Sequence, residues 1–81
     1  MIVRAEFYSR LRELVGSNSL EIVLGEGATV YDMREQLCGV YPKLRDFKKS
    51  MLFGIGVEFV NLEQPLRNGE VVAIMPPVQG G

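Results

Sequence analysis

The group best placed for chemistry in this 81-residue sequence is the carboxylate of Gly81, which closes the last seven residues, MPPVQGG. Two closing glycines add nothing to a strand or a helix, because glycine loses the most backbone entropy on ordering. Chain ends are often frayed, and fraying alone would account for glycine here. The glycines follow an apolar run and the stiff pair Pro76-Pro77, however, and this context favours a functional tail.

A carboxylate is a poor electrophile, but joining the Gly81 carboxylate to AMP would supply a good leaving group. A sulfur nucleophile such as sulfide or persulfide could then attack the activated carbonyl. The enzyme must admit the tail through a narrow channel, where residues without a Cβ atom allow close contacts on every side. Pro76 and Pro77 favour an extended exit and lower the ordering cost of insertion. We therefore expect Pro76, Pro77, Val78 and Gly80 to thread through the channel and Gly81 to react.

The remaining candidates for catalysis are weak. The sequence has no histidine and a single cysteine, Cys38, which has no partner for an internal disulfide and no imidazole to activate it. We interpret Cys38 as a small residue packed at the edge of the core. No set of ligands predicts a metal site, and Gly54-Ile55-Gly56 lacks the context of a phosphate-binding loop. We therefore expect no autonomous catalysis, no bound cofactor and no bound metal.

Composition and charge narrow the class of protein. With 47% hydrophobic and 23% charged residues, the chain resembles one small globular domain. A net charge of −1 gives no reason to expect a nucleic-acid partner or an anionic membrane. We interpret the densest basic stretch, residues 43–49, as a solvated face. No apolar stretch is long enough to cross a bilayer and no signal peptide is visible, so we expect a cytoplasmic protein.

The spacing of apolar residues predicts where strands and helices lie. We expect strands at residues 2–8, 20–24, 51–55, 58–60 and 71–75, helices at 10–15 and 30–40, and a short helical turn over 42–49. Ser9 is expected to cap the first helix and Gly16 to end it. Thr29 and Asp32 are expected to form a capping box on the second helix. Gly56-Val57 suits the tight turn of a hairpin.

One long helix packed on one face of a mixed sheet is the economical arrangement for this order of elements. The almost wholly apolar last strand belongs at the centre of the sheet, parallel to the first strand. These features predict an α+β fold of the β-grasp, ubiquitin-like kind, with about five strands. Residues 1–75 form the predicted domain, and residues 76–81 a flexible tail that leaves from the end of a central strand.

A tail that visits partner enzymes needs a docking surface beside it, which we expect to be apolar. Tyr8 shares a strand face with Arg4 and Glu6, so its side chain should point away from the helix. Met75 ends the central strand just before the tail, and Phe59 is a large aromatic residue in a short strand. We predict Tyr8, Phe59 and Met75 as a docking patch on the sheet face opposite the helix. The alternative is that Phe59 and Met75 complete the core.

Three stretches carry a resemblance to a known family: residues 7–16 (FYSRLRELVG), 64–73 (QPLRNGEVVA) and 75–81 (MPPVQGG). The chain resembles the small subunit of molybdopterin synthase, within the wider family of ubiquitin-like sulfur carriers. The resemblance implies that an activating enzyme of the ubiquitin-activating type uses ATP to adenylate Gly81, and that a sulfur donor converts Gly81 to a thiocarboxylate. The large subunit of molybdopterin synthase then delivers this sulfur to a pterin precursor to build the dithiolene. The chain would be a non-catalytic subunit and co-substrate.

Three other functions stay open. The sulfur carrier of thiamin thiazole synthesis shares the fold and the tail but serves another acceptor; such carriers are usually shorter, so the helical segment after Pro42 favours the molybdopterin acceptor. A protein modifier would join Gly81 to lysine side chains through an isopeptide bond. A plain binding module would leave the tail inert.

Overall fold

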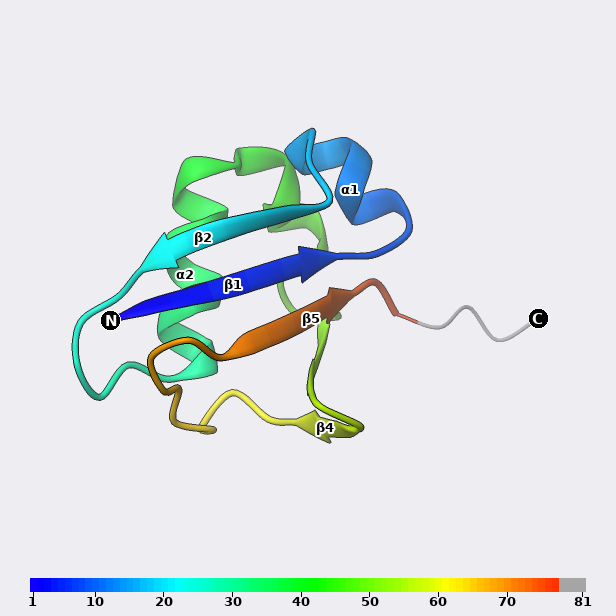
Figure 1. The fold of residues 1–81 in the computed structure, drawn as a ribbon. Coiled ribbons are helices and arrows are strands. Elements are labelled where there is room, and N and C mark those ends of the chain that lie inside the picture. Colours follow the sequence, from blue (N-terminus) through cyan, green and yellow to red (C-terminus); the bar gives the residue numbers. More distant parts are fainter. Residues whose placement is uncertain (78–81) are drawn as a thin grey trace.

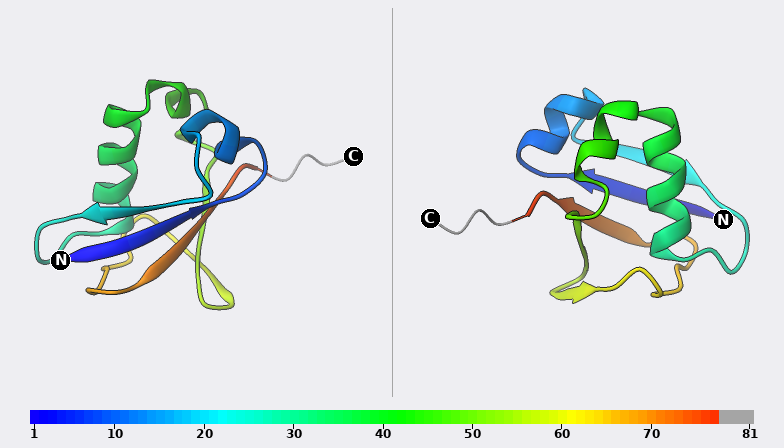
Figure 2. Two further views of the ribbon diagram at one scale, coloured as in Figure 1. Left: turned by 45° about the horizontal axis from the view of Figure 1, so that its top comes forward. Right: turned by 180° about the vertical axis from the view of Figure 1, so that it is seen from behind.

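The computed structural model describes residues 1–77, so Val78, Gly80 and Gly81 of the predicted tail lie outside the described residues. Along the chain the elements are β1 (Ile2–Phe7), α1 (Arg10–Val15), β2 (Ser19–Val23), α2 (Val30–Val40), the 3-10 helix η1 (Pro42–Phe47), β3 (Leu52–Ile55), β4 (Glu58–Val60) and β5 (Val71–Met75). The helices cover one face of a five-stranded sheet (Figure 1 and Figure 2). Each element expected from the sequence is present, with ends shifted by at most two residues.

The strand order is β2-β1-β5-β3-β4, which is the β-grasp arrangement expected from the sequence. β5 lies at the centre, parallel to β1 with Val72 opposite Ala5, and antiparallel to β3 with Ile74 opposite Phe53. β2 pairs antiparallel with β1 at one edge, and β4 pairs antiparallel with β3 at the other. The β3–β4 turn contains Gly56 with a φ of 63°, a conformation that favours glycine.

The core is the layer between the sheet and the helices. Alternate residues of β1 and β5 point into this layer, where α2 covers them, because successive side chains of a strand face opposite sides of the sheet. The largest fully buried side chains are Val3, Leu11, Val30, Met33, Leu44, Val72 and Ile74. β5 is buried on this face alone: Val71, Ala73 and Met75 are half-buried or exposed on the other face. The apolar outer face of β5 is therefore part of the protein surface.

The second helix starts and the first helix ends as their sequences predict. At α2, the Thr29 N–H donates to Asp32 Oδ2 at 2.8 Å and the Asp32 N–H donates to Thr29 Oγ1 at 3.4 Å, forming the capping box. At α1, Gly16 adopts the left-handed conformation with a φ of 82°, and its N–H donates to the Arg12 carbonyl at 2.8 Å. Within residues 1–77, no helix has the length and apolarity needed to span a bilayer.

The start of α1 differs from the prediction. Ser9 stands at the N-cap position, but its side chain makes no capping hydrogen bond. Its backbone has a φ of 57°, which is uncommon for a residue other than glycine. The reason is the short connection: the Tyr8 N–H still donates to the Ile74 carbonyl of β5 at 3.1 Å, so the chain must turn sharply at Ser9. The predicted Ser9 side-chain cap is therefore wrong.

Candidate functional site

The described part of the tail, Pro76 and Pro77, leaves from the end of β5 at the centre of the sheet (Figure 1). The exit is held by strand pairing on both sides. On one side Tyr8 is bonded to Ile74, and on the other Leu52 of β3 lies opposite Met75. The tail therefore starts from a fixed position. Gly81, the predicted reacting residue, lies beyond the described residues with Val78 and Gly80, and their roles stay predictions.

A shallow groove of about 310 Å³ lies beside this exit, and we call it the sheet groove. It is formed by the ends of β1 and β5, by β3 and by the β3–β4 hairpin. Its lining residues are Tyr8, Gly54, Gly56, Val57, Glu58, Phe59, Ala73 and Met75. The structure thus brings the three residues of the predicted docking patch to one surface. Their part in binding a partner stays a prediction.

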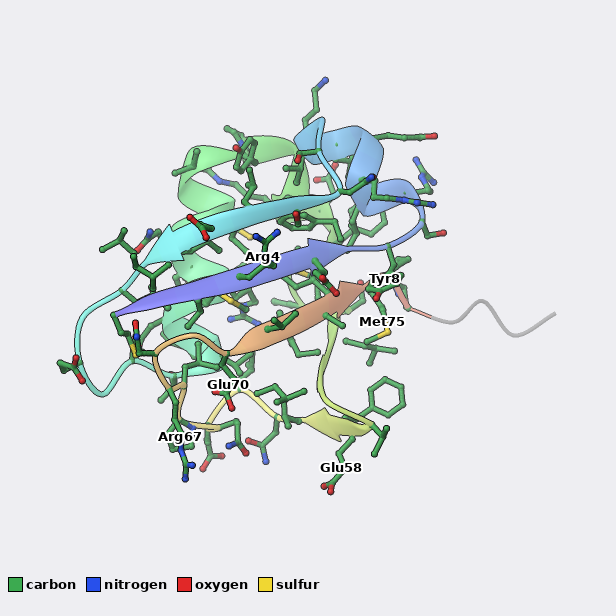
Figure 3. All side chains as sticks on the ribbon, in the orientation of Figure 1. Arg4, Tyr8, Glu58, Arg67, Glu70 and Met75 are labelled. Atoms are coloured by element: carbon green, nitrogen blue, oxygen red, sulfur yellow. The ribbon has the colours of Figure 1, made fainter. Side chains whose placement is uncertain are left out.

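The sheet groove is mainly apolar and open to solvent. Phe59 is 72% exposed and Tyr8 46% exposed, so neither side chain completes the core. Tyr8 and Met75 lie together at the ends of their strands, whereas the Glu58 side chain points away from them (Figure 3). A contiguous apolar surface of this kind is typical of protein–protein contacts.

Gly54 and Ala73 form the floor of the sheet groove, where they lie opposite each other on β3 and β5. A Cβ atom on Gly54 would lie 3.4 Å from the Glu58 carbonyl oxygen and 3.5 Å from Met75 Cε. The groove is hollow because these two residues are small. Sequence reasoning considered Gly54 only as part of a phosphate-binding loop and assigned neither residue to the docking surface, although a glycine inside a strand is a known signal of close approach by another group.

Cys38 packs in the core of the domain. The residue is 3% exposed, and burial raises the pKa of its thiol, so the reactive thiolate is disfavoured. This placement agrees with its interpretation as a packed residue. Within residues 1–77, no three His, Cys, Asp or Glu side chains gather where they could hold a metal ion.

A charged cluster joins α2 to the segment that follows η1. Glu35 lies between two cations: Lys48 Nζ is 2.7 Å from its Oε1, and Arg34 Nη2 is 3.1 Å from its Oε2. The hydrogen bond from Lys48 is the main cause that lowers the pKa of the Glu35 carboxyl. Because Lys48 lies shortly before β3, the cluster ties α2 to the segment that leads into β3. Sequence reasoning did not identify it.

The sequence is similar to one known protein family and to individual proteins with known names. The family model described as the ThiS family matches residues 5–81. A molybdopterin synthase sulfur carrier subunit from Chlamydomonas reinhardtii is 31% identical, and the alignment covers 100% of each chain. Small archaeal modifier protein 1 from Haloferax volcanii is also 31% identical, over 94% of this chain and 97% of that protein.

Solved structures extend the comparison to the fold. The crystal structure of the Haloferax volcanii modifier matches with a TM-score of 0.85 at 26% identity and covers 100% of both chains. A complex of subunits 1 and 2 of molybdopterin-converting factor from Helicobacter pylori contains a chain that matches with a TM-score of 0.71 at 21% identity, again over 100% of both chains. Because the identity to the Helicobacter pylori chain is only 21%, this match shows a shared fold and nothing more.

Proposed function

Because this chain belongs to the ThiS family, we propose that it is the sulfur carrier subunit of a molybdopterin synthase, with the carboxylate of Gly81 as its reacting group. The family match runs to residue 81, and the Chlamydomonas carrier aligns with the chain from end to end. The structural observation that carries the proposal is the sheet groove beside the tail exit. A partner that takes the tail into its active site would come close to this surface.

The first steps take place on an activating enzyme of the ubiquitin-activating type. The Gly81 carboxylate attacks the α-phosphate of ATP, and pyrophosphate leaves, which gives an acyl adenylate. Hydrosulfide then attacks the carbonyl carbon, the bond to AMP breaks with its electron pair on the departing oxygen, and a thiocarboxylate forms. A persulfide donor would give an acyl disulfide, which a thiol must then reduce. The chain itself supplies the electrophile and no catalytic side chain.

The second stage takes place on the large subunit, which binds the pterin precursor. The thiocarboxylate sulfur attacks a carbon of that precursor and displaces an oxygen leaving group from it, which gives a thioester to Gly81. Water then attacks the thioester carbonyl, so the sulfur stays on the precursor and the Gly81 carboxylate is restored. Pro76 and Pro77 give the tail an extended start, because the proline ring fixes φ and removes the backbone donor that would continue the sheet. Tyr8, Phe59 and Met75 would form the contact that holds the domain while the tail reacts.

A truncated chain tests this proposal. Removal of Gly80 and Gly81 should leave the melting temperature unchanged, because neither residue has a side chain to bury. The truncated chain should still bind the large subunit through the sheet groove but should support no dithiolene formation from the pterin precursor. Dithiolene formation by the truncated chain at the rate of the full chain would contradict the proposal. A thiazole precursor that accepts the sulfur in place of the pterin would instead identify the thiamin pathway.

A second candidate function is covalent modification of other proteins. The observation that favours it is the 31% identity to a relative named as a small archaeal modifier. The activated Gly81 would then be attacked by a lysine amine, giving an isopeptide bond. Proteolysis of cellular protein followed by mass spectrometry would detect Gly81 joined to lysine side chains. The absence of such adducts from cells that make the thiocarboxylate would exclude this function.

A further inference from the structure

A second pocket, of about 230 Å³, shares Phe59 with the sheet groove. We call it the basic pocket. Three cationic side chains line it, from Arg34, Lys48 and Lys49, together with apolar walls that include Phe53, Phe59 and Val60. The reaction of the tail requires none of these cations, so it leaves the basic pocket unexplained.

The pocket carries more positive than negative charge. Glu35 pairs with both Arg34 and Lys48, at 3.1 and 2.7 Å, but it does not line the pocket, and neither does any other acidic residue. Lys49 is exposed and makes no ion pair within residues 1–77. One neighbouring carboxylate thus pairs with two of the three cations, and the lining of the pocket keeps a net positive charge.

Arg34 is held in place rather than free to leave the pocket. It is 9% exposed, its Nη1 donates to the Lys48 carbonyl at 3.2 Å, and its guanidinium carbon lies 5.3 Å from the centre of the Tyr31 ring. These contacts fix one cation at the pocket wall beside the apolar side chains. A fixed cation next to apolar surface is suited to a carboxylate that is partly removed from water.

The size and the position of the pocket indicate its occupant. Its volume lies below the roughly 300–1,000 Å³ of sites that enclose a whole small ligand. It opens at the end of β3, where Leu52 lies opposite Met75, and therefore close to the tail exit. Six residues, the number from Pro76 to Gly81, can span at most about 20 Å. A protein that holds Gly81 in its active site is thus close enough to cover both the sheet groove and the basic pocket.

We propose that the docking surface continues past Phe59 into the basic pocket, and that the pocket receives an acidic side chain next to an apolar one from the protein that takes up the tail. This inference rests on the proposed function, because it needs a partner that binds the tail. It adds the chemistry of that partner: an aspartate or glutamate beside a residue such as leucine or phenylalanine. The carboxylate would orient the domain, while the sheet groove supplies the apolar contact.

Charge reversal of Lys49 tests the inference, with Lys43 as a matched control. Both lysines are exposed, and Lys43 lies in η1 outside the pocket, so Lys43→Glu makes the same change of net charge elsewhere. The dissociation constant is measured by calorimetry with the large subunit of molybdopterin synthase from the same organism. Lys49→Glu should raise Kd about tenfold, Lys43→Glu less than about twofold, and Lys49→Arg should bind nearly as the parent chain. The effect of Lys49→Glu should shrink as salt is added.

Three results would overturn the inference. Equal losses for Lys49→Glu and Lys43→Glu would show a general charge effect. A loss at Lys49 that disappears when residues 78–81 are removed would show that the pocket holds this chain's own tail. Normal binding by Lys49→Glu with weak binding by Phe59→Ala would reject the pocket and keep the docking surface. A different experiment tests the proposed function: it would be wrong if the parent chain gained no thiocarboxylate with its activating enzyme.

Discussion

Replacement of Phe59 by alanine separates a docking role from a structural one. The side chain is 72% exposed in the free chain and lies on β4 at the edge of the sheet. Removing so exposed a side chain should change the free energy of unfolding by no more than about 0.5 kcal/mol. A partner that covers the sheet groove would bury most of the ring, and full burial of a phenylalanine is worth about 2 kcal/mol. That loss corresponds to a rise in Kd of roughly 30-fold.

The assay is calorimetric titration of the large subunit, with thermal unfolding of the same variants. Val23→Ala is the control, because Val23 is 69% exposed on β2, at the opposite edge of the sheet from β4. The control should change neither Kd nor the melting temperature. A fall in the melting temperature of Phe59→Ala by more than about 5 °C, with an unchanged Kd, would refute the reasoning and place Phe59 in the folding core.

Three further predictions concern the frame that positions the site. Ser9→Gly should raise stability by about 1 kcal/mol, because glycine adopts the φ of 57° at that position without strain, and chemical denaturation would measure the gain. Thr29→Ala should lower the free energy of unfolding by about 1 kcal/mol through loss of the α2 capping box. Thr29→Ser should keep most of that stability in the same assay, because serine also has a side-chain hydroxyl that can cap the helix. Glu35→Gln should lower the melting temperature at neutral pH. Lys48 lowers the pKa of Glu35 in the folded state, so the contribution of Glu35 to stability is present above the unfolded pKa. That contribution is lost as the pH falls through the folded pKa, and the melting temperatures of parent and variant should therefore converge in acid.

The sequence was sufficient to predict the elements and their order because each signal is local. Alternation over residues 2–8 and helical spacing over residues 30–40 each lie within one element, and Thr29 with Asp32 forms a cap within four neighbouring positions. The central place of β5 followed from its apolar composition. The Ser9 cap failed because the turn there depends on a bond from Tyr8 to Ile74, which no local pattern encodes.

The sequence predicted only part of the candidate site, again because contacts between distant residues leave no local pattern. Strand parity for Tyr8, and position for Phe59 and Met75, predicted a patch whose three residues the fold brings to one groove. The hollow between them depends on Gly54 lying opposite Ala73, and that register appears only once β3 pairs with β5. Lys48 and Lys49 suggested a solvated face, but the fold places them with Arg34 around an apolar pocket. Contacts between residues distant in the sequence created both surfaces.

The central claim is that Gly81 carries sulfur, and intact-protein mass spectrometry tests it most directly. The chain is incubated with its activating enzyme, ATP and hydrosulfide, and the product is then fragmented to locate the change. The account predicts a gain in mass equal to the exchange of one oxygen for one sulfur, confined to Gly81. Sulfur found on Cys38, with Gly81 unchanged, would contradict it.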